Sequence, residues 1–540
     1  MYRLHKLIHL SALPRLNHCQ ALLLSVLPPC PPGKMSTPFF TVTSSLCTAL
    51  LICNAACCGA QSIAVPWSGY GHDAQHTGIS SVAAQPMNAC RWQTPVDEHP
   101  QYSGSTLYIH YGSPIATRAN TIIFPVKTGD YDGFRLEARN GANGSVTWTQ
   151  ASDYTLPAHG WVPSFNAALT PKNRLWYPGA GGSVYFRDTP DAATGTSEQI
   201  TFYGMGNLNP AVKISTPLTT DRYGNVFFGF VVEGTVTLPG DVPLLSGIAR
   251  VAEDGTCSWR SASFAAGGAA GIVKVVGNCA PALSNDHRTL YFAVSMGSDS
   301  GGYVVSLDSR TLAPIAKIQL KDPHLTGYDA SLPDDGTASP TVGPDGDVYF
   351  GVLEASRGSN HYRGWMLHFD AALSQVKIPG AFGWDDTASI VPSSAVPAYT
   401  GTSKYLLLTK YNNYAGVGGN GLNKVAVLDP NDTMADPVTG VSVMKEILTA
   451  LGPTPDAEYP TFPGAVREWC INTAAVDPIG KCAIVNSEDG KVYRWDFTTN
   501  ALIQTVTLTP GIGEAYTPTI IGVDGRIYAI SNAILFCVGQ

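Results

Sequence analysis

Nine side chains in the loops of this sequence are of types that bind ligands or carry out chemistry. Each lies shortly before a short, small-residue strand of a repeat; they are His110, His159, Trp161, Asp335, Trp384, Asp386, Glu468, Trp469 and Glu514. Aromatic faces combined with acidic acceptors suit carbohydrate, a cationic group or a metal ion. We expect a binding mouth where these loops converge, although any one of these residues taken alone is better explained as an ordinary loop residue.

The sequence contains no motif of a known catalytic or metal chemistry. There is no Cys-x-x-Cys, no Gly-x-Ser-x-Gly and no phosphate-binding loop, so catalytic residues and metal ligands stay unassigned. His72 and His76 are four residues apart, but their segment is Gly-rich and is predicted to be a loop. Packing and hydrogen bonding beneath the domain is therefore the favoured interpretation of both histidines.

One pattern recurs along the chain and positions these loops. A segment of small residues leads through a polar or Gly turn into an aromatic and β-branched strand, as in 339–350 and 517–528. Eight copies occur at a mean spacing of about 58 residues, which suits a four-stranded blade. Further alternating strands follow most copies. The sequence predicts an all-β, eight-bladed β-propeller of four-stranded antiparallel blades, with 441–451 as an outer strand or a single helix.

The two ends of the predicted domain supply the parts of one blade. The last repeat stops after three strands, and the strand near 89–95 has no blade of its own. Because circular closure removes exposed sheet edges, we expect this N-terminal strand to complete the last blade. The propeller would then occupy residues 61–540 as a single domain.

Six cysteines follow the first 60 residues, an even number that permits three disulfides in an exported chain. If the closing strand pairs with the last strand, Cys90 and Cys537 lie side by side. The positions of the others in the repeats then predict the pairs Cys257–Cys279 and Cys470–Cys482. The alternative is that all six are free thiols.

The first 60 residues are predicted to be a targeting segment. They contain two apolar stretches, no acidic residue, and a small-residue run near Cys57 that offers a cleavage site or a lipid anchor on that cysteine. Translation could start at Met1 or at Met35. No later segment is apolar enough to cross a membrane, so the expected location is exported: periplasmic, extracellular or lipid-anchored. The net charge of −8 argues against nucleic acid as a partner.

The segment 67–78, Trp-Ser-Gly-Tyr-Gly-His-Asp-Ala-Gln-His-Thr-Gly, resembles the opening of many quinoprotein-like propeller proteins. The Pro-containing hairpins of the repeat resemble those of the same superfamily, the PQQ-like repeat propellers, over about residues 65–540. The superfamily includes pyrroloquinoline quinone (PQQ) dehydrogenases, outer-membrane assembly lipoproteins and non-catalytic binding propellers. Fold alone does not choose among them.

The leading hypothesis for function is an exported, non-catalytic binding or scaffold propeller with a protein or carbohydrate ligand at the channel mouth. One alternative is a PQQ-dependent oxidoreductase acting on an alcohol or sugar, for which the resemblance would imply PQQ and calcium as cofactors. No residue matches the family's calcium ligands or base, so no cofactor is assigned. A second alternative is a glycan-active enzyme that uses Asp386 and Glu468.

Overall fold

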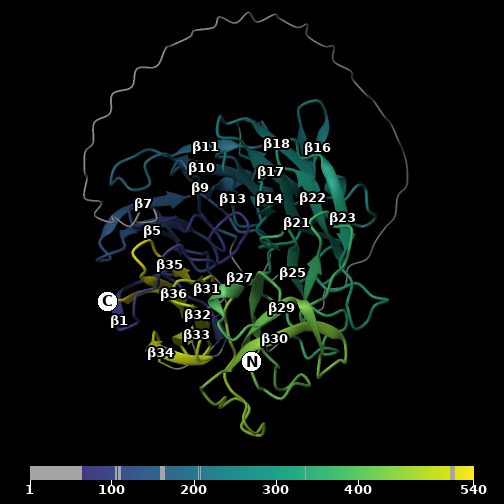
Figure 1. Ribbon diagram of the computed structural model, residues 1–540. Helices are drawn as coiled ribbons and strands as arrows, with labels where there is room; N and C mark the ends of the chain where they lie inside the picture. The colour runs from purple at the N-terminus through teal and green to yellow at the C-terminus, as the bar shows by residue number, and fades with distance from the viewer. Residues whose placement is uncertain are drawn as a thin grey trace, which may run out of the picture. The chain divides into compact units, whose positions relative to one another are not determined.

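Ten antiparallel sheets account for the strands of this protein, and eight of them are propeller blades. The computed structural model describes residues 64–103, 106–107, 111–158, 164–204, 206, 208–334, 336–510 and 517–540. These residues belong to one compact unit that begins at Ala64. Figure 1 shows the sheets following one another around a central axis in sequence order.

The first four blades each run from a very short inner strand to an outer edge. Blade 1 has β4 (Ile115–Ala116), β5 (Thr121–Lys127), β6 (Phe134–Asn140) and β7 (Val146–Ser152); blade 2 has β8 (Ala168–Leu169), β9 (Leu175–Pro178), β10 (Ser183–Arg187) and β11 (Glu198–Thr201). In blade 3, β12 (Val212–Ile214) and β13 (Thr219–Thr220) both pair with β14 (Val226–Val232), followed by β17 (Gly247–Val251) and β18 (Cys257–Ser261). In blade 4, β19 (Lys274–Val275) and β20 (Ala282–Leu283) both pair with β21 (Thr289–Ser295), followed by β22 (Gly302–Asp308) and β23 (Pro314–Gln319).

The remaining blades repeat this plan with one abbreviation. Blade 5 has three strands, β24 (Thr341–Val342), β25 (Val348–Val352) and β26 (Trp365–Phe369), with isolated bridges to 376 and 380 outside them. Blade 6 has β27 (Ser389–Pro392), β28 (Tyr405–Tyr411), β29 (Lys424–Ala435) and β30 (Ser442–Leu451); blade 7 has β31 (Ala475–Asp477), β32 (Cys482–Ser487), β33 (Lys491–Asp496) and β34 (Ala501–Thr507). The segment predicted as outer strand or helix is therefore a strand, β30.

Blade 8 is assembled from both ends of the described chain. Its strands are β35 (Ile520–Ile521), β36 (Ile527–Ser531), β37 (Ile534–Gly539) and, from the N-terminal side, β1 (Ala89–Pro95). β1 pairs antiparallel with β37 from Ala89 opposite Gly539 to Pro95 opposite Ile534. This confirms the eight-bladed fold and its closure by the N-terminal strand.

Smaller elements lie outside this plan. Two hairpins are formed by β2 (Tyr102–Ser103) with β3 (Thr106–Leu107) and by β15 (Val236–Leu238) with β16 (Val242–Leu244). The helical turns are η1 (Ala180–Gly182), α1 (Ala262–Ala265) and η2 (Ser393–Ala395). None of the helices in the described ranges has the length and apolar character needed to span a membrane.

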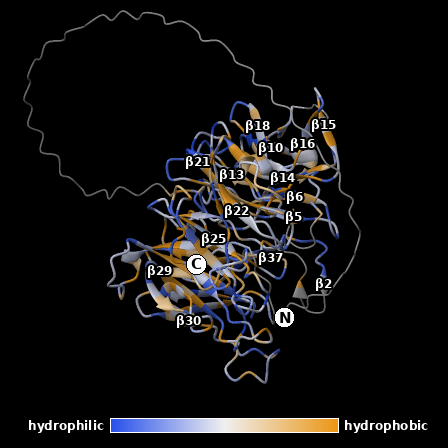
Figure 2. Ribbon diagram, turned by 90° about the vertical axis from the view of Figure 1, so that its right-hand side faces the viewer, coloured by the Kyte–Doolittle hydropathy of each residue, from blue (hydrophilic) through white to orange (hydrophobic). Residues whose placement is uncertain are grey.

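The hydrophobic core lies between neighbouring blades rather than along the axis. One cluster of buried residues joins blades 1 to 3, another joins blades 4 to 6, and smaller ones join blades 3 and 4, 6 and 7, and 8 and 1. Because both faces of each sheet pack on a neighbouring blade, the strands inside a blade are buried along their whole length, as in β5, β25 and β28. Figure 2 shows these hydrophobic stretches running along the strands, for example on β29.

The segment 67–85 fastens the blades together at the end of the inner strands. It exchanges one backbone hydrogen bond after another with the ring: Ala116 N with Trp67 O, Leu169 N with Ser68 O, Leu283 N with Ala74 O, Val342 N with Gln75 O, Ile390 N with Thr77 O, Val476 N with Gly78 O, and Gln85 N with Gly525 O, all 2.7–3.0 Å long. These bonds reach blades 1, 2 and 4 to 8 in order. We call residues 67–85 the strap; it occupies the face on which the inner strands end.

The strap explains the two histidines as structural residues. The His72 ring lies 4.7 Å from the Trp67 ring and its Nδ1 lies 3.1 Å from Asp73. His76 Nδ1 lies 2.7 Å from the carbonyl oxygen of Pro340. Burial would raise the pKa of Asp73, but bonds from His72 and Thr77 lower it to about 2, whereas burial lowers the pKa of His76 to about 4.

Candidate functional site

The opposite face, where the inner strands begin, is tied by hydrogen bonds between neighbouring blades. They join residues just before successive inner strands: Ser113 N to Asn166 (2.6 Å), Ala280 N to Ser339 (2.9 Å), Ser339 N to Thr387 (3.0 Å), Thr387 N to Asn472 O (3.0 Å) and the Thr517 hydroxyl to Tyr111 O (2.8 Å). Small polar side chains are needed here because eight strands converge on the axis. The face with the predicted mouth is thus held together by its own polar groups.

Tyr70 links blades 5, 6 and 7 through a single side chain. Its hydroxyl donates to the carbonyl oxygen of Thr337 (2.8 Å), bonds to the Thr387 hydroxyl (2.9 Å) and contacts the amide oxygen of Asn472. Tyr70 is 5% exposed and burial raises the pKa of its hydroxyl. Because Thr337, Thr387 and Asn472 precede three inner strands, the strap reaches through the ring to the level of the predicted mouth.

Two adjacent carboxyl groups, Asp385 and Asp386, lie next to this tyrosine layer. They are 2% and 1% exposed, and Asp385 accepts bonds from the amide (2.7 Å) and hydroxyl of Thr337. Lys410 Nζ on β28, itself 1% exposed, lies 3.9 Å from Asp385 Oδ2. Burial raises the pKa of Asp385 and raises that of Asp386 well above its usual range, against the pull of Lys410.

The residues around these acids do not fit a quinone with calcium. The cavity beside Asp385, bounded by Phe350, Leu353 and Trp384 among others, has a volume of about 20 Å³, which is space for about one water molecule. Among the described residues, no group of three or more His, Cys, Asp or Glu side chains is placed to hold a metal ion. In the same layer, the Tyr70 hydroxyl already bonds to polar groups of blades 5, 6 and 7.

Four of the nine predicted mouth residues lie in the part of the chain that the structure describes. Trp384 is half-buried beside Gly336, Asp386 is buried, and Glu468 sits next to Glu488. Burial and the Glu488 charge raise the pKa of Glu468 to about 8. Asp386 is closed to solvent, whereas a glycosidase needs two carboxyl groups flanking the bond it cleaves. His110, His159, Trp161, Asp335 and Glu514 lie outside the described residues.

Trp469 requires a correction, because its side chain has no exposed surface. Its indole nitrogen donates to the carbonyl oxygen of Asn423 (3.2 Å), and its ring packs edge-on against Tyr493 with centroids 5.6 Å apart. It therefore fills the space between blades 6 and 7, where a large apolar side chain is needed, and does not form part of a concave binding surface with Trp384.

The predicted disulfides are not shown by the structure, in which no disulfide joins the described cysteines. β1 and β37 are neighbours as expected, but Cys90 stands opposite Val538 and Cys537 opposite Trp92, with an irregularity between them. Trp469 bridges Ser487, at the far end of β32 from Cys482, so Cys470 and Cys482 lie apart. Cys257 begins the outer strand β18, whereas Cys279 precedes the inner strand β20.

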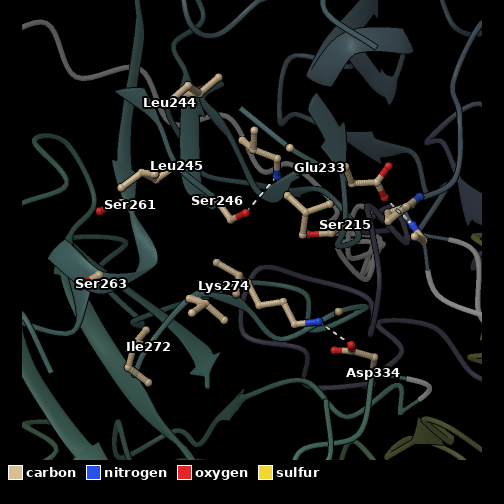
Figure 3. Close-up of a pocket in the computed structure, with 18 residues that line it drawn as sticks. Ser215, Glu233, Leu244, Leu245, Ser246, Ser261, Ser263, Ile272, Lys274 and Asp334 are labelled. Carbon is tan, nitrogen blue, oxygen red and sulfur yellow. Dashed lines mark hydrogen bonds and ion pairs between the residues drawn. The ribbon is translucent and has the colours of Figure 1, made fainter. Parts of the chain in front are cut away.

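A pocket lies off the axis, over blades 3 and 4. It has a volume of about 530 Å³, within the range of small-molecule sites. Figure 3 shows an aliphatic side with Leu244, Leu245 and Ile272 and a polar side with Ser215, Glu233, Lys274 and Asp334. Val231, Val232 and Val273 complete the walls. We call this site the blade 3–4 pocket.

Two oxygens of residues at the pocket have no partner among the described residues. The Ser215 hydroxyl and Asp334 Oδ1 are buried without a hydrogen bond, while Asp334 Oδ2 pairs with Lys274 Nζ. Because both unpaired oxygens are closed to solvent, they do not face the open volume of the pocket, whose polar wall is formed by Glu233 and the Lys274–Asp334 ion pair. Sequence analysis missed this pocket because Ser215 and Lys274 fall in no motif; the only signal was the extra sequence in blades 3 and 4.

Comparisons with known proteins identify the fold. No family model and no curated protein matches the chain. A europium-containing methanol dehydrogenase is 9% identical, covers 87% of this chain and 91% of its own, with a TM-score of 0.51. Quinohemoprotein alcohol dehydrogenase from Comamonas testosteroni is 12% identical, covering 88% and 81%, with a TM-score of 0.52. BamB from Moraxella catarrhalis is 14% identical, covering 83% and 98%, with a TM-score of 0.39.

The likeness to the two alcohol dehydrogenases and the eight closed blades define the fold. The chain is an eight-bladed propeller similar in fold to these quinoprotein dehydrogenases, as the repeats indicated. At these identities the likeness concerns the fold alone.

Proposed function

We propose that this chain is an exported, non-catalytic binding propeller whose ligand occupies the blade 3–4 pocket. The observation that carries the proposal is a preformed cavity of about 530 Å³ in which an aliphatic wall faces Glu233 and the Lys274–Asp334 ion pair. The site lies on the face predicted for the mouth, but beside the axis rather than on it. Export is supported by the composition of residues 1–60, which lie outside the described residues together with the proposed lipid anchor at Cys57.

The oxidoreductase alternative rests on fold similarity, and the described residues at the axis leave little space for a cofactor or substrate. Its acids Asp385 and Asp386 are closed to solvent and lie beside a cavity of about 20 Å³. A binding protein needs no such acids, only a preformed concave site with a few fixed polar groups. The glycan-active alternative meets the same obstacle at Asp386, and the described residues that line the blade 3–4 pocket include no aromatic side chain for a sugar ring.

The test compares binding with turnover on the full chain. Ligand-observed NMR with a panel of small neutral amides and alcohols should show binding that Leu245→Asp abolishes and Ile503→Asp leaves intact. Both residues are about half exposed, at 52% and 51%, but Ile503 lies on β34 of blade 7, away from the pocket. The same protein mixed with PQQ and Ca²⁺ should give no dye-linked oxidation of alcohols. Quinone-dependent turnover, or binding indifferent to Leu245→Asp, would refute the proposal.

A further inference from the structure

A second concave surface lies between the outer strands of blades 2 and 3, which form part of the rim in Figure 1. It has a volume of about 650 Å³ and is lined by residues 202–204, which follow β11, by β18 and by Phe264 of α1. This volume is within the range of ligand sites. We call this surface the blade 2–3 groove; of its described lining residues, only Ser261 also lines the blade 3–4 pocket.

Aromatic side chains form the apolar part of the blade 2–3 groove. Phe202 is 2% exposed, and its ring packs on that of Phe230 with centroids 4.3 Å apart, so the core holds it from behind. Trp259 is half-buried on β18, and its ring also packs edge-on against Phe230. Phe264 is 52% exposed. The groove therefore combines fixed aromatic rings with a free one, and an aromatic side chain placed between them would bury additional apolar surface.

Arg260 adds a positive charge to this groove. Its guanidinium carbon lies 5.5 Å from the centroid of the Phe264 ring, and its N–H groups donate to the carbonyl oxygens of Trp259 (2.8 Å) and Thr311 (3.5 Å). These acceptors are neutral, so they hold the guanidinium in place without matching its charge. The remaining donors of the guanidinium are available to a carboxylate.

A second cation without an acidic partner lies on the next blade. Lys317 is exposed on β23, the outer strand of blade 4, and its ammonium group donates to the carbonyl oxygen of Ala266 at 2.6 Å. Neither Lys317 nor Arg260 forms a salt bridge with a described residue, although the chain has 41 acidic and only 33 basic residues. Met205 and Asn207, the residues next to the groove in sequence that lie outside the described ranges, are uncharged. A negatively charged partner would therefore meet two positive charges that the described protein leaves unmatched.

The placement of the rings and the two cations favours a protein segment as that partner. Arg260 lines the groove, whereas Lys317 is on another blade and is not among the lining residues. A segment with successive acidic residues can hold a ring in the groove and still reach the second cation. A lipid surface fits less well, because Phe202, at 2% exposed, is recessed behind the rim.

We propose that the blade 2–3 groove binds an acidic segment of a partner protein that carries one aromatic side chain. The aromatic ring lies against Trp259 and Phe264. The carboxylate next to it in the segment pairs with Arg260, and a further carboxylate reaches Lys317. This second site goes beyond the proposed function and does not depend on it, because the blade 3–4 pocket has other walls.

Three peptides test the two parts of this ligand on the full chain, by ligand-observed NMR titration. Acetyl-Ala-Phe-Glu-Glu-amide should bind about tenfold more tightly than acetyl-Ala-Ala-Glu-Glu-amide, which lacks the ring. It should bind about fivefold more tightly than acetyl-Ala-Phe-Gln-Gln-amide, which lacks the charges. In about 1 M NaCl the Phe-Glu-Glu and Phe-Gln-Gln peptides should bind alike, because salt then screens charges beyond about 3 Å.

Variants of the full chain assign the binding to the groove. Phe264→Ala and Arg260→Gln should each weaken the Phe-Glu-Glu peptide about fivefold, and Lys317→Gln about twofold. Arg91→Gln is the matched control and should change nothing, because Arg91 is exposed on β1, the outer strand of blade 8. Phe264→Ala should keep the melting temperature of the wild type, because the side chain is half exposed.

Each contrary outcome removes a stated part of the inference. Equal binding of the Phe-Glu-Glu and Phe-Gln-Gln peptides at low salt would refute the acidic partner, and equal binding of the alanine peptide would refute the aromatic anchor. Peptide binding that ignores both Phe264→Ala and Arg260→Gln would refute the groove as the site. If no peptide binds, or if only phosphatidylglycerol vesicles do, a protein segment is refuted as the partner. Leu245→Asp should leave the peptide unaffected, so failure of this inference and failure of the proposed function are distinguishable.

Discussion

The axis and the blade 3–4 pocket are built from similar residues but differ in what those residues face. At the axis, Asp385 bonds to Thr337 and the Tyr70 hydroxyl meets three blades, so polar groups are directed at one another across a layer without room for a ligand. In the pocket, Glu233 and the Lys274–Asp334 ion pair line a cavity of about 530 Å³. The two regions therefore differ in open volume and not in whether polar groups are paired, because buried oxygens without a partner occur in both: Asp386 Oδ2 at the axis and Asp334 Oδ1 at the pocket.

The comparison implies that disturbing the axis should cost stability, and the buried cation offers the largest effect. Among the described residues, Lys410 is the one cation that acts on the buried Asp385 and Asp386. Lys410→Met removes its charge and leaves both acids without it. Breaking a buried ion pair in this way costs about 3–5 kcal/mol. Urea unfolding at pH 8 should show this loss. The loss should shrink as the pH is lowered, because acids with raised pKa values take up protons more readily.

A matched double variant tests the cause of that loss. Adding Asp386→Asn to Lys410→Met should restore part of the stability at pH 8, because one of the two buried negative charges is gone. If the single and double variants unfold at the same urea concentration, the loss comes from packing and the electrostatic account of the axis is wrong.

The next largest loss of stability is expected from Tyr70, the residue through which the strap contacts the mouth face. Tyr70→Phe keeps the ring but removes the hydroxyl that Thr337, Thr387 and Asn472 share. Each of these groups keeps another partner, since Asn472 donates to the Thr337 carbonyl oxygen, Ser339 N to Thr387 and the Thr473 hydroxyl to Asn472. The expected cost is therefore that of the lost hydrogen bonds, about 1–2 kcal/mol. Tyr102→Phe is the control, because Tyr102 is 45% exposed and its hydroxyl meets only Asn532. Equal stability of the two variants in urea unfolding would show that the strap does not hold the mouth face.

Much more of the fold than of the candidate site could be predicted from the sequence. Strand alternation and the small-residue hairpins repeat eight times, so the blades and the pairing of β1 with β37 could be predicted from local patterns. Trp469 and Trp384 look alike in sequence, yet only packing decides that Trp469 is enclosed between blades. Ser215 and Lys274 are 59 positions apart, and the additional strands β12 of blade 3 and β19 of blade 4 bring them to one pocket. The repeat pattern does not predict these two strands.

The smallest effect concerns Glu468, which belongs to neither the closed axis nor the pocket and so measures the acid burial of the mouth face by itself. Its folded-state pKa is raised to about 8 by burial and by Glu488, whereas the unfolded chain titrates near the ordinary value of about 4.3. A raised carboxyl pKa means that the folded state holds the proton more tightly. Its contribution to stability is therefore complete below about pH 4 and is lost as pH rises towards 8.

Glu468→Gln, which cannot ionise, should be more stable than the wild type by about 1–2 kcal/mol at pH 9 and equal to it at pH 4. Glu198→Gln, on the exposed face of β11, should show no such trend. Urea unfolding across this pH range decides the matter: a constant difference between Glu468→Gln and the wild type would mean that Glu468 is ionised in the folded protein throughout, and that the mouth face tolerates buried charge as readily as the surface does.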